Sequence, residues 1–121
     1  MQGNIFPLTV HLGTPGANVT SVLGLAVPCQ LIAVTAVGSN ATAATFDCGT
    51  PADPDGIFDG KTFGQSDAAA TYDVGDFNGA LATANQPYPF SAGDELEWSV
   101  DYDGSSGTAL QGGSIIFWFA S

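Results

Sequence analysis

Hydrophobic and polar side chains alternate with a period of two along much of this chain. In an early segment, Leu8, Val10 and Leu12 alternate with Thr9 and His11. A period of two sends successive side chains to opposite faces, as in a β-strand with one buried face. The same period returns over residues 95–102, where the inward positions are Leu96, Trp98, Val100 and Tyr102. The pattern predicts a protein built from β-strands without a strong helix.

Two further segments are apolar on both faces. Residues 29–37 carry apolar side chains on both faces, which is typical of a central strand in a two-layer fold. Residues 114–120 place Ile115, Phe117 and Phe119 on one face, with Ile116 and Trp118 on the other. We therefore expect both faces of this last strand to be covered, by the second sheet or by another chain.

The Gly38-Ser39 pair predicts a tight type II′ turn between two strands. A two-residue loop at this point would set Leu31 opposite Phe46 and Cys29 opposite Cys48. A disulfide between the two cysteines would then be geometrically possible. In a reducing compartment we instead favour buried thiols that act as small hydrophobic side chains.

The pattern weakens over residues 49–89, where Gly, Asp, Ala and Pro dominate. A short alternating stretch covers residues 71–77, and residues 79–84 could form a helical turn. Abundant glycine and six clear strands predict an all-β, antiparallel β-sandwich. We prefer a jelly roll, which holds about eight strands, with an immunoglobulin-like sandwich as the alternative. At 121 residues, we expect one domain over residues 1–121.

Charge removes several classes of function. Twelve acidic side chains face one cation, Lys61, and the formal net charge is −11. A protein that binds nucleic acids or anionic membrane surfaces uses Lys and Arg to neutralise phosphates, so we expect neither as a partner. No run of about 18 apolar residues predicts a membrane span. The N-terminus lacks the basic and apolar regions of a secretory signal, which favours synthesis and assembly in a cytoplasm.

Catalytic chemistry has few candidates. His11 is the single histidine, and nothing in the sequence singles out a nucleophile or an orienting acid for it. Glu95 and Glu97 share a strand face, but the third carboxylate of the Glu-x-Asp-x-x-Glu glycosidase pattern is missing. We interpret that face as solvated, and we expect neither an enzyme nor a cofactor.

The acidic segment 53–60 is a candidate calcium-binding loop. Asp53, Asp55 and Asp59 offer carboxylates, which Ca²⁺ prefers. The EF-hand pattern fails in both registers, because Ile57 falls where an acidic residue or asparagine is required. We interpret the segment as turn-forming and keep the three aspartates as weak calcium candidates.

Several stretches together resemble a known family. The strand Leu-Ile-Ala-Val-Thr-Ala-Val over residues 31–37 leads to Ala-Thr-Phe-Asp-Cys-Gly-Thr over residues 44–50. Later come Ser-Ala-Gly-Asp-Glu-Leu over residues 91–96 and the closing Gly-Gly-Ser-Ile-Ile-Phe-Trp-Phe. As a pattern over most of the chain, this resembles the jelly-roll head decoration (cement) proteins of tailed bacteriophages. The family implies a homotrimer on the outer surface of the capsid, in the virion, bound to the major capsid protein.

The resemblance also suggests which segments make contacts. We expect residues 1–7 and the aromatic loops to touch the capsid or neighbouring subunits. The candidate interface residues are Ile5, Phe6, Phe58, Phe63, Phe77 and Trp118. The alternative function is a glycan- or receptor-binding fibre or head module, which requires an exposed aromatic platform. A small β-sandwich hydrolase is third, and requires a pocket with convergent acids.

Overall fold

Nine strands and one short 3₁₀ turn make up a computed structural model that describes residues 4–121. In chain order the strands are β1 (Ile5–Gly13), β2 (Val19–Gly24), β3 (Cys29–Val37), β4 (Thr45–Thr50), β5 (Asp53–Thr62), β6 (Ala70–Asp73), β7 (Tyr88–Phe90), β8 (Glu95–Asp101) and β9 (Gly113–Ala120). The 3₁₀ turn, η1 (Val74–Asp76), follows β6 directly. Within the described residues, no helix is long and apolar enough to cross a membrane.

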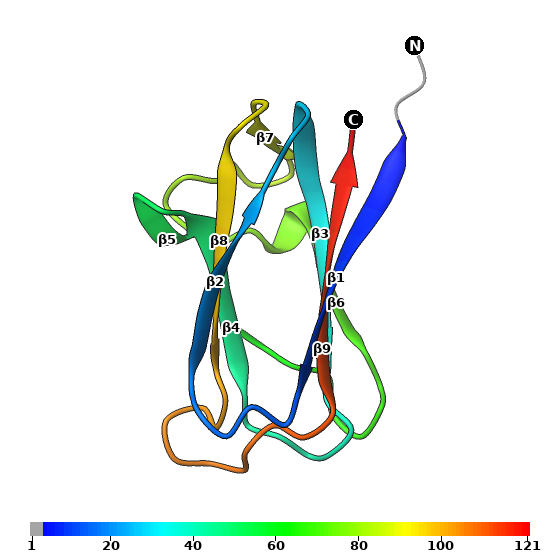
Figure 1. Ribbon diagram of the computed structural model, residues 1–121, viewed down its shortest axis with the longest axis vertical. Helices are drawn as coiled ribbons and strands as arrows, with labels where there is room; N and C mark the ends of the chain where they lie inside the picture. The colour runs from blue at the N-terminus through cyan, green and yellow to red at the C-terminus, as the bar shows by residue number, and fades with distance from the viewer. Residues whose placement is uncertain (1–3) are drawn as a thin grey trace.

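The strands form two antiparallel sheets that face one another (Figure 1). Sheet A has five strands in the order β1-β9-β3-β6, and β7 also pairs with β3. Sheet B has four strands in the order β2-β8-β4-β5. The chain thus crosses between the sheets repeatedly, and its first and last strands pair. The fold is an all-β sandwich, as predicted, and this strand order is consistent with a jelly roll.

The long alternating segments form the strands expected of them. β3 is central, because it pairs with β9 on one side and with β6 and β7 on the other. On β8, Leu96, Trp98 and Val100 are buried, while Tyr102 lies just beyond the strand and is half-buried. On β9 the side chains of Ile115, Phe117 and Phe119 point into the core and are fully buried. These strands supply much of the apolar layer between the sheets.

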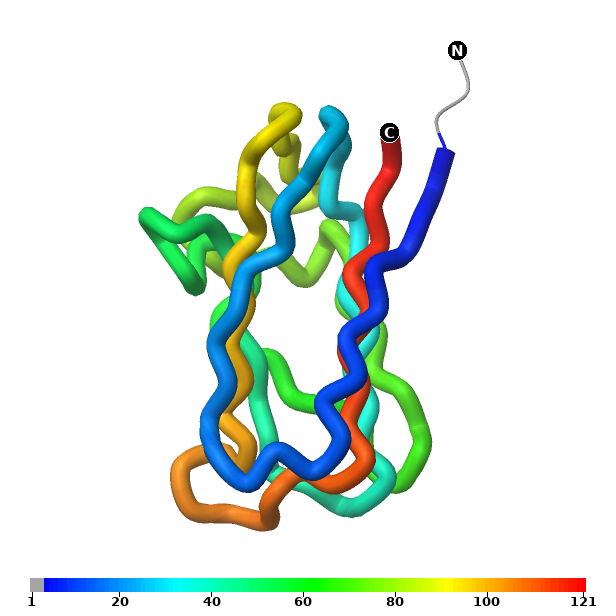
Figure 2. The backbone as a smooth tube through the Cα atoms, in the orientation of Figure 1, coloured from blue at the N-terminus to red at the C-terminus, as the bar shows by residue number. Residues whose placement is uncertain are grey.

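The predicted hairpin at Gly38-Ser39 is wrong. Gly38 does not have the positive φ that a type II′ turn needs at its first central position. The chain instead leaves sheet A at this point and reaches β4 in sheet B, a path visible in the tube of Figure 2. The Asn40 side-chain nitrogen donates to the Ala109 carbonyl at 2.8 Å, and Thr42 Oγ1 donates to the Thr108 carbonyl at 3.1 Å. These bonds hold the crossing segment against the loop that precedes β9.

The loss of this hairpin also removes the proposed cysteine pairing. Cys29 lies on β3 opposite Phe90, whereas Cys48 lies on β4 opposite Trp98 and Phe58. Both cysteines are buried free thiols. Burial raises the pKa of each thiol above its ordinary value, most strongly for the fully buried Cys48.

The middle of the chain is more regular than its composition suggests. Residues 53–62 form β5, the longest strand, which the sequence pattern did not reveal. Pro54 and Gly56 weaken a strand in general, but β5 is an edge strand with two register shifts against β4, where such residues are tolerated. The predicted helical turn at residues 79–84 is absent: the backbone N–H groups of Gly79 and Leu81 instead donate to carbonyls of β5.

Candidate functional site: two outer sheet faces of opposite character

His11 and the strand carboxylates do not assemble a catalytic group. His11 is exposed on the outer side of β1, and within residues 4–121 its side-chain hydrogen bond is to Ser114 Oγ, 3.3 Å from Nδ1. Glu95 and Glu97 lie on the outward face of β8, as expected for a solvated strand. The arrangement contains no His-carboxylate pair of the kind that activates a nucleophile.

The three calcium candidates do not converge. Among the described residues, no group of three or more His, Cys, Asp or Glu side chains is placed to hold a metal ion. Asp53 interacts with Asp55, and this side-chain hydrogen bond is the largest cause of its raised pKa. Asp59 lies instead near Asp47 of the neighbouring strand. The three candidates therefore do not gather around one point, as the ligands of a calcium loop do.

Asp47 carries a carboxylate whose charge is disfavoured by its surroundings. Its pKa is raised, first by burial and then by the nearby charges of Asp59 and Asp55, although the Gly60 N–H donates to Oδ1 at 2.6 Å and lowers it. A raised pKa means that the folded state holds the proton more tightly than the unfolded chain. Stability from this group is therefore present at low pH and is lost as pH rises through the raised folded pKa.

Asp47→Asn should raise the free energy of unfolding at pH 7 by less than about 1 kcal/mol, since the site is partly solvated and screened. The asparagine oxygen can still accept from Gly60 N–H. The gain should vanish near pH 3, where the wild-type carboxyl is largely protonated. Urea unfolding at the two pH values measures the difference. An equal or larger gain at pH 3 would contradict the stated cause.

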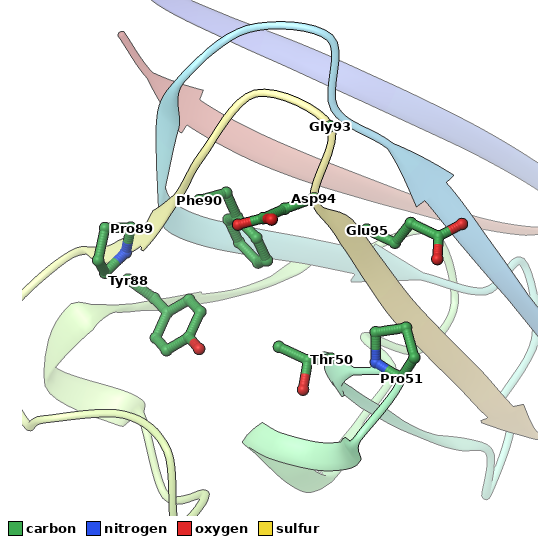
Figure 3. A pocket seen from close by; sticks show the side chains of 8 residues that line it. All are labelled: Thr50, Pro51, Tyr88, Pro89, Phe90, Gly93, Asp94 and Glu95. Carbon is green, nitrogen blue, oxygen red and sulfur yellow. The ribbon is translucent and has the colours of Figure 1, made fainter.

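An open groove at one end of the sandwich does not fit a glycan site. This first groove has a volume of about 340 Å³ and is lined by Thr50, Pro51, Tyr88, Pro89, Phe90, Gly93, Asp94 and Glu95 (Figure 3). Tyr88 is half-buried and packs edge-on against Phe90, with ring centroids 5.1 Å apart. Asp94 Oδ2 accepts the Ser91 N–H at 2.8 Å, while Glu95 extends in another direction. Neither an exposed aromatic platform nor a convergent pair of acids is present here.

The outer face of sheet A carries almost no charge. Strand register places Ile116 between Thr9 and Thr35, and Trp118 between Pro7 and Ala33. The outward residues on three of its strands are Ile5, Pro7, Thr9 and His11 on β1, Ser114, Ile116, Trp118 and Ala120 on β9, and Gln30, Ala33, Thr35 and Val37 on β3. None of these is Asp, Glu, Lys or Arg. We call this set the carboxylate-free face; Asp73 borders it on β6.

Trp118 lies at the centre of the carboxylate-free face. Its ring is half-buried, and its Nε1 donates to Thr35 Oγ1 at 3.1 Å. Thr35 Oγ1 in turn lies 2.9 Å from Thr71 Oγ1 on β6. The indole of β9 is therefore tied to β3 by a hydrogen bond. It offers a rigid aromatic surface rather than a mobile side chain.

The outer face of sheet B has the opposite character. Glu95, Glu97 and Asp101 point outward along β8, and Asp47 points outward from β4 beside Ser99. Asp59 on β5 adds a further carboxylate next to Asp47. Lys61 does not offset these charges: its Nζ lies over the rings of Tyr72 and Phe58, 5.5 and 6.0 Å from their centroids. This face favours water.

The six candidate interface residues divide between surface and core. Ile5 is 66% exposed, and Trp118 is half-buried on the carboxylate-free face. Phe6 points inward and stacks on Phe119 at 5.5 Å. Phe58, Phe63 and Phe77 are buried in the core of the protomer, so their side chains are not available to a partner. Residues 1–3 of the expected contact segment 1–7 lie outside the described residues.

Comparisons with known proteins add one structural likeness. No protein-family model matches the chain, and no curated protein matches it. A chain of the cyanophage Pam1 capsid asymmetric unit is similar in structure, with 13% sequence identity, coverage of 98% of this chain and 83% of that one, and a TM-score of 0.46. Because identity and TM-score are this low, the functional conclusion depends on the two outer faces of the chain itself.

Proposed function

We propose that the protein is a non-enzymatic structural component of a tailed-phage virion. It acts as a decoration protein that binds the outer surface of the capsid as a homotrimer and ties neighbouring shell proteins together. Its partners are other copies of itself and the major capsid protein. The proposal combines the resemblance in the sequence with the surfaces described above, and one observation carries it.

That observation is the difference between the two outer faces. A sheet face with Trp118, Ile116 and Ile5 and no carboxylate is suited to being covered by protein, because exposed apolar patches favour association. The opposite face holds Glu95, Glu97 and Asp101, which favour water and repel other polyanions. A shell-bound protein needs both kinds of surface: one to bind and one to face the solvent.

The charge balance supports the outer rather than the inner side of a shell. A protein in contact with packaged DNA needs cations, but here Lys61 is the single Lys or Arg. That lysine lies over two aromatic rings. The formal charge of −11 would repel a phosphate backbone and keep neighbouring particles apart.

The direct test is cosedimentation of the purified full chain with intact virions of the phage that encodes it. We expect saturable binding to the particle, and a solution mass equal to three protomers. The chain spun without virions controls for self-pelleting. A chain that stays in the supernatant at every concentration of virions would overturn the proposed function.

A further inference from the structure

Ile5 is the most exposed large hydrophobic side chain among the described residues, at 66%. It lies at the start of β1 and belongs to one cross-strand row of sheet A. In this row Ile5 pairs with Ala120, Ala120 with Gln30, and Gln30 with Pro89. Ile5 therefore projects from one end of the carboxylate-free face, where water surrounds most of its side chain.

A second groove occupies the other end of the same row. It has a volume of about 320 Å³ and is lined by Pro28, Cys29, Gln30, Pro89, Phe90, Ala120 and Ser121. No side chain in its lining is charged, whereas the first groove contains Asp94 and Glu95. Two prolines and Phe90 make its walls apolar. The second groove is thus suited to an uncharged apolar side chain.

Ile5 does not line the second groove of its own protomer, although its strand neighbour Ala120 does. Gln30 lies on the far side of Ala120, two strand spacings or roughly 10 Å from Ile5. Most of the Ile5 side chain remains in water, where a neighbouring molecule can contact it.

The charge distribution favours another copy of this chain as the molecule that contacts Ile5 and the second groove. Two copies with a net charge of −11 repel one another wherever their carboxylates meet. Ile5 lies on the carboxylate-free face, and the second groove adjoins that face through Gln30 and Ala120, so these two parts can meet with fewer carboxylates nearby than on the outer face of sheet B. A strongly basic partner would instead be attracted to the acidic outer face of sheet B.

We propose that Ile5 of one copy enters the second groove of a neighbouring copy and anchors the contact between subunits. The inference rests on the proposed homotrimer and names the surface that builds it. Ile5 and the groove are different parts of the protomer, so the contact is heterologous. A heterologous contact closes into a ring of three when each copy is rotated by a third of a turn from the previous one.

The first test is Ile5→Ser, with Val22→Ser as the matched control. Val22 is 42% exposed on sheet B, so both changes remove an exposed apolar side chain without touching the core. Analytical ultracentrifugation should show self-association weakened by about tenfold or more for Ile5→Ser. The control should assemble like wild type. Equal behaviour of the two variants would overturn the proposal.

The second test locates the contact by crosslinking. Ile5→Cys and Gln30→Cys are made in separate chains and mixed, so that any disulfide between them joins two copies. We expect a covalent dimer to form in the mixture under mild oxidation. Ile5→Cys mixed with Val22→Cys controls for random collision and for the native thiols. An assembled protein that gives no crosslink above this control would place the contact elsewhere.

The outcomes also separate this inference from the proposed function. A chain that cosediments with virions and has the mass of a trimer, but gives no crosslink between Ile5→Cys and Gln30→Cys, refutes the Ile5 contact alone. Crosslinked, assembled chain that never binds virions refutes the virion role and leaves the contact between copies standing.

Discussion

Replacing Phe58 with alanine should lower the free energy of unfolding by about 3–5 kcal/mol. Phe58 is fully buried on β5, and its ring centroid lies 5.0 Å from that of Phe77 and 6.0 Å from that of Phe46. Removing it leaves a cavity and deprives Lys61 of one of its two aromatic partners. Thermal and urea unfolding monitored by tryptophan fluorescence would measure the loss.

The matched control is Ile5→Ala, which removes an apolar side chain that is 66% exposed. Its free energy of unfolding, measured at a concentration where the chain is monomeric, should stay within about 0.5 kcal/mol of wild type. The pair distinguishes core from contact residues. If Phe58→Ala kept full stability but lost binding to a partner, Phe58 would be a contact residue and the packing described here would be wrong.

Replacing Gly79 with alanine should destabilise the protein by more than about 3 kcal/mol. A Cβ at this position would lie 2.0 Å from the Gly56 carbonyl carbon and 2.4 Å from the Ile57 nitrogen, both backbone atoms that cannot rotate away. The segment must then leave β5 and give up the hydrogen bond from Gly79 N–H to the Ile57 carbonyl. Phe77, two residues earlier, would be pulled from the core.

Gly24→Ala is the control for Gly79→Ala. Gly24 ends β2, has no positive φ, and a Cβ there meets nothing within 4 Å. The free energy of unfolding of Gly24→Ala should be unchanged or slightly higher than that of wild type, because alanine restricts the unfolded chain. Melting temperatures of the two variants, measured in parallel, compare the effects. A small effect at Gly79 would mean that residues 77–82 are not docked on β5.

Long runs of alternation were sufficient to predict strands. Residues 29–37, predicted from apolar positions on both faces, form β3 over the whole predicted range. The core positions of β8 and β9 alternate as expected, except that Tyr102 lies beyond the end of β8. The prediction works there because each strand has one face sealed in the core, so its side chains must alternate. The same logic gave the sandwich class, since apolar sheet faces need a second layer.

The alternation of hydrophobic and polar residues did not predict the structure of the middle third of the chain, because that structure depends on contacts with strands elsewhere in the chain. β5 contains Pro54, Gly56 and Gly60, which individually argue against a strand. It forms because β4 offers a free edge and two bulges absorb the misfit. For the same reason, the sequence pattern places Phe58, Phe63 and Phe77 in loops that would contact the capsid or a neighbouring subunit. No local signal shows that Phe58 and Phe63 pack against Phe46, or that Phe77 packs against Phe58, inside the sandwich.

The candidate site shows the same division. Composition alone established the excess of acids and the lone lysine, and therefore which partners are excluded. The alternation along residues 114–120 indicated that Ile116 and Trp118 share one strand face, opposite the face that carries Ile115, Phe117 and Phe119. Only strand order put Pro7 and Thr9 of β1, Trp118 of β9 and Thr35 of β3 side by side as one surface without carboxylates. Local side-chain chemistry decides which face of a strand is buried, whereas the pairing of strands far apart in the chain is decided by long-range packing, which no short segment encodes.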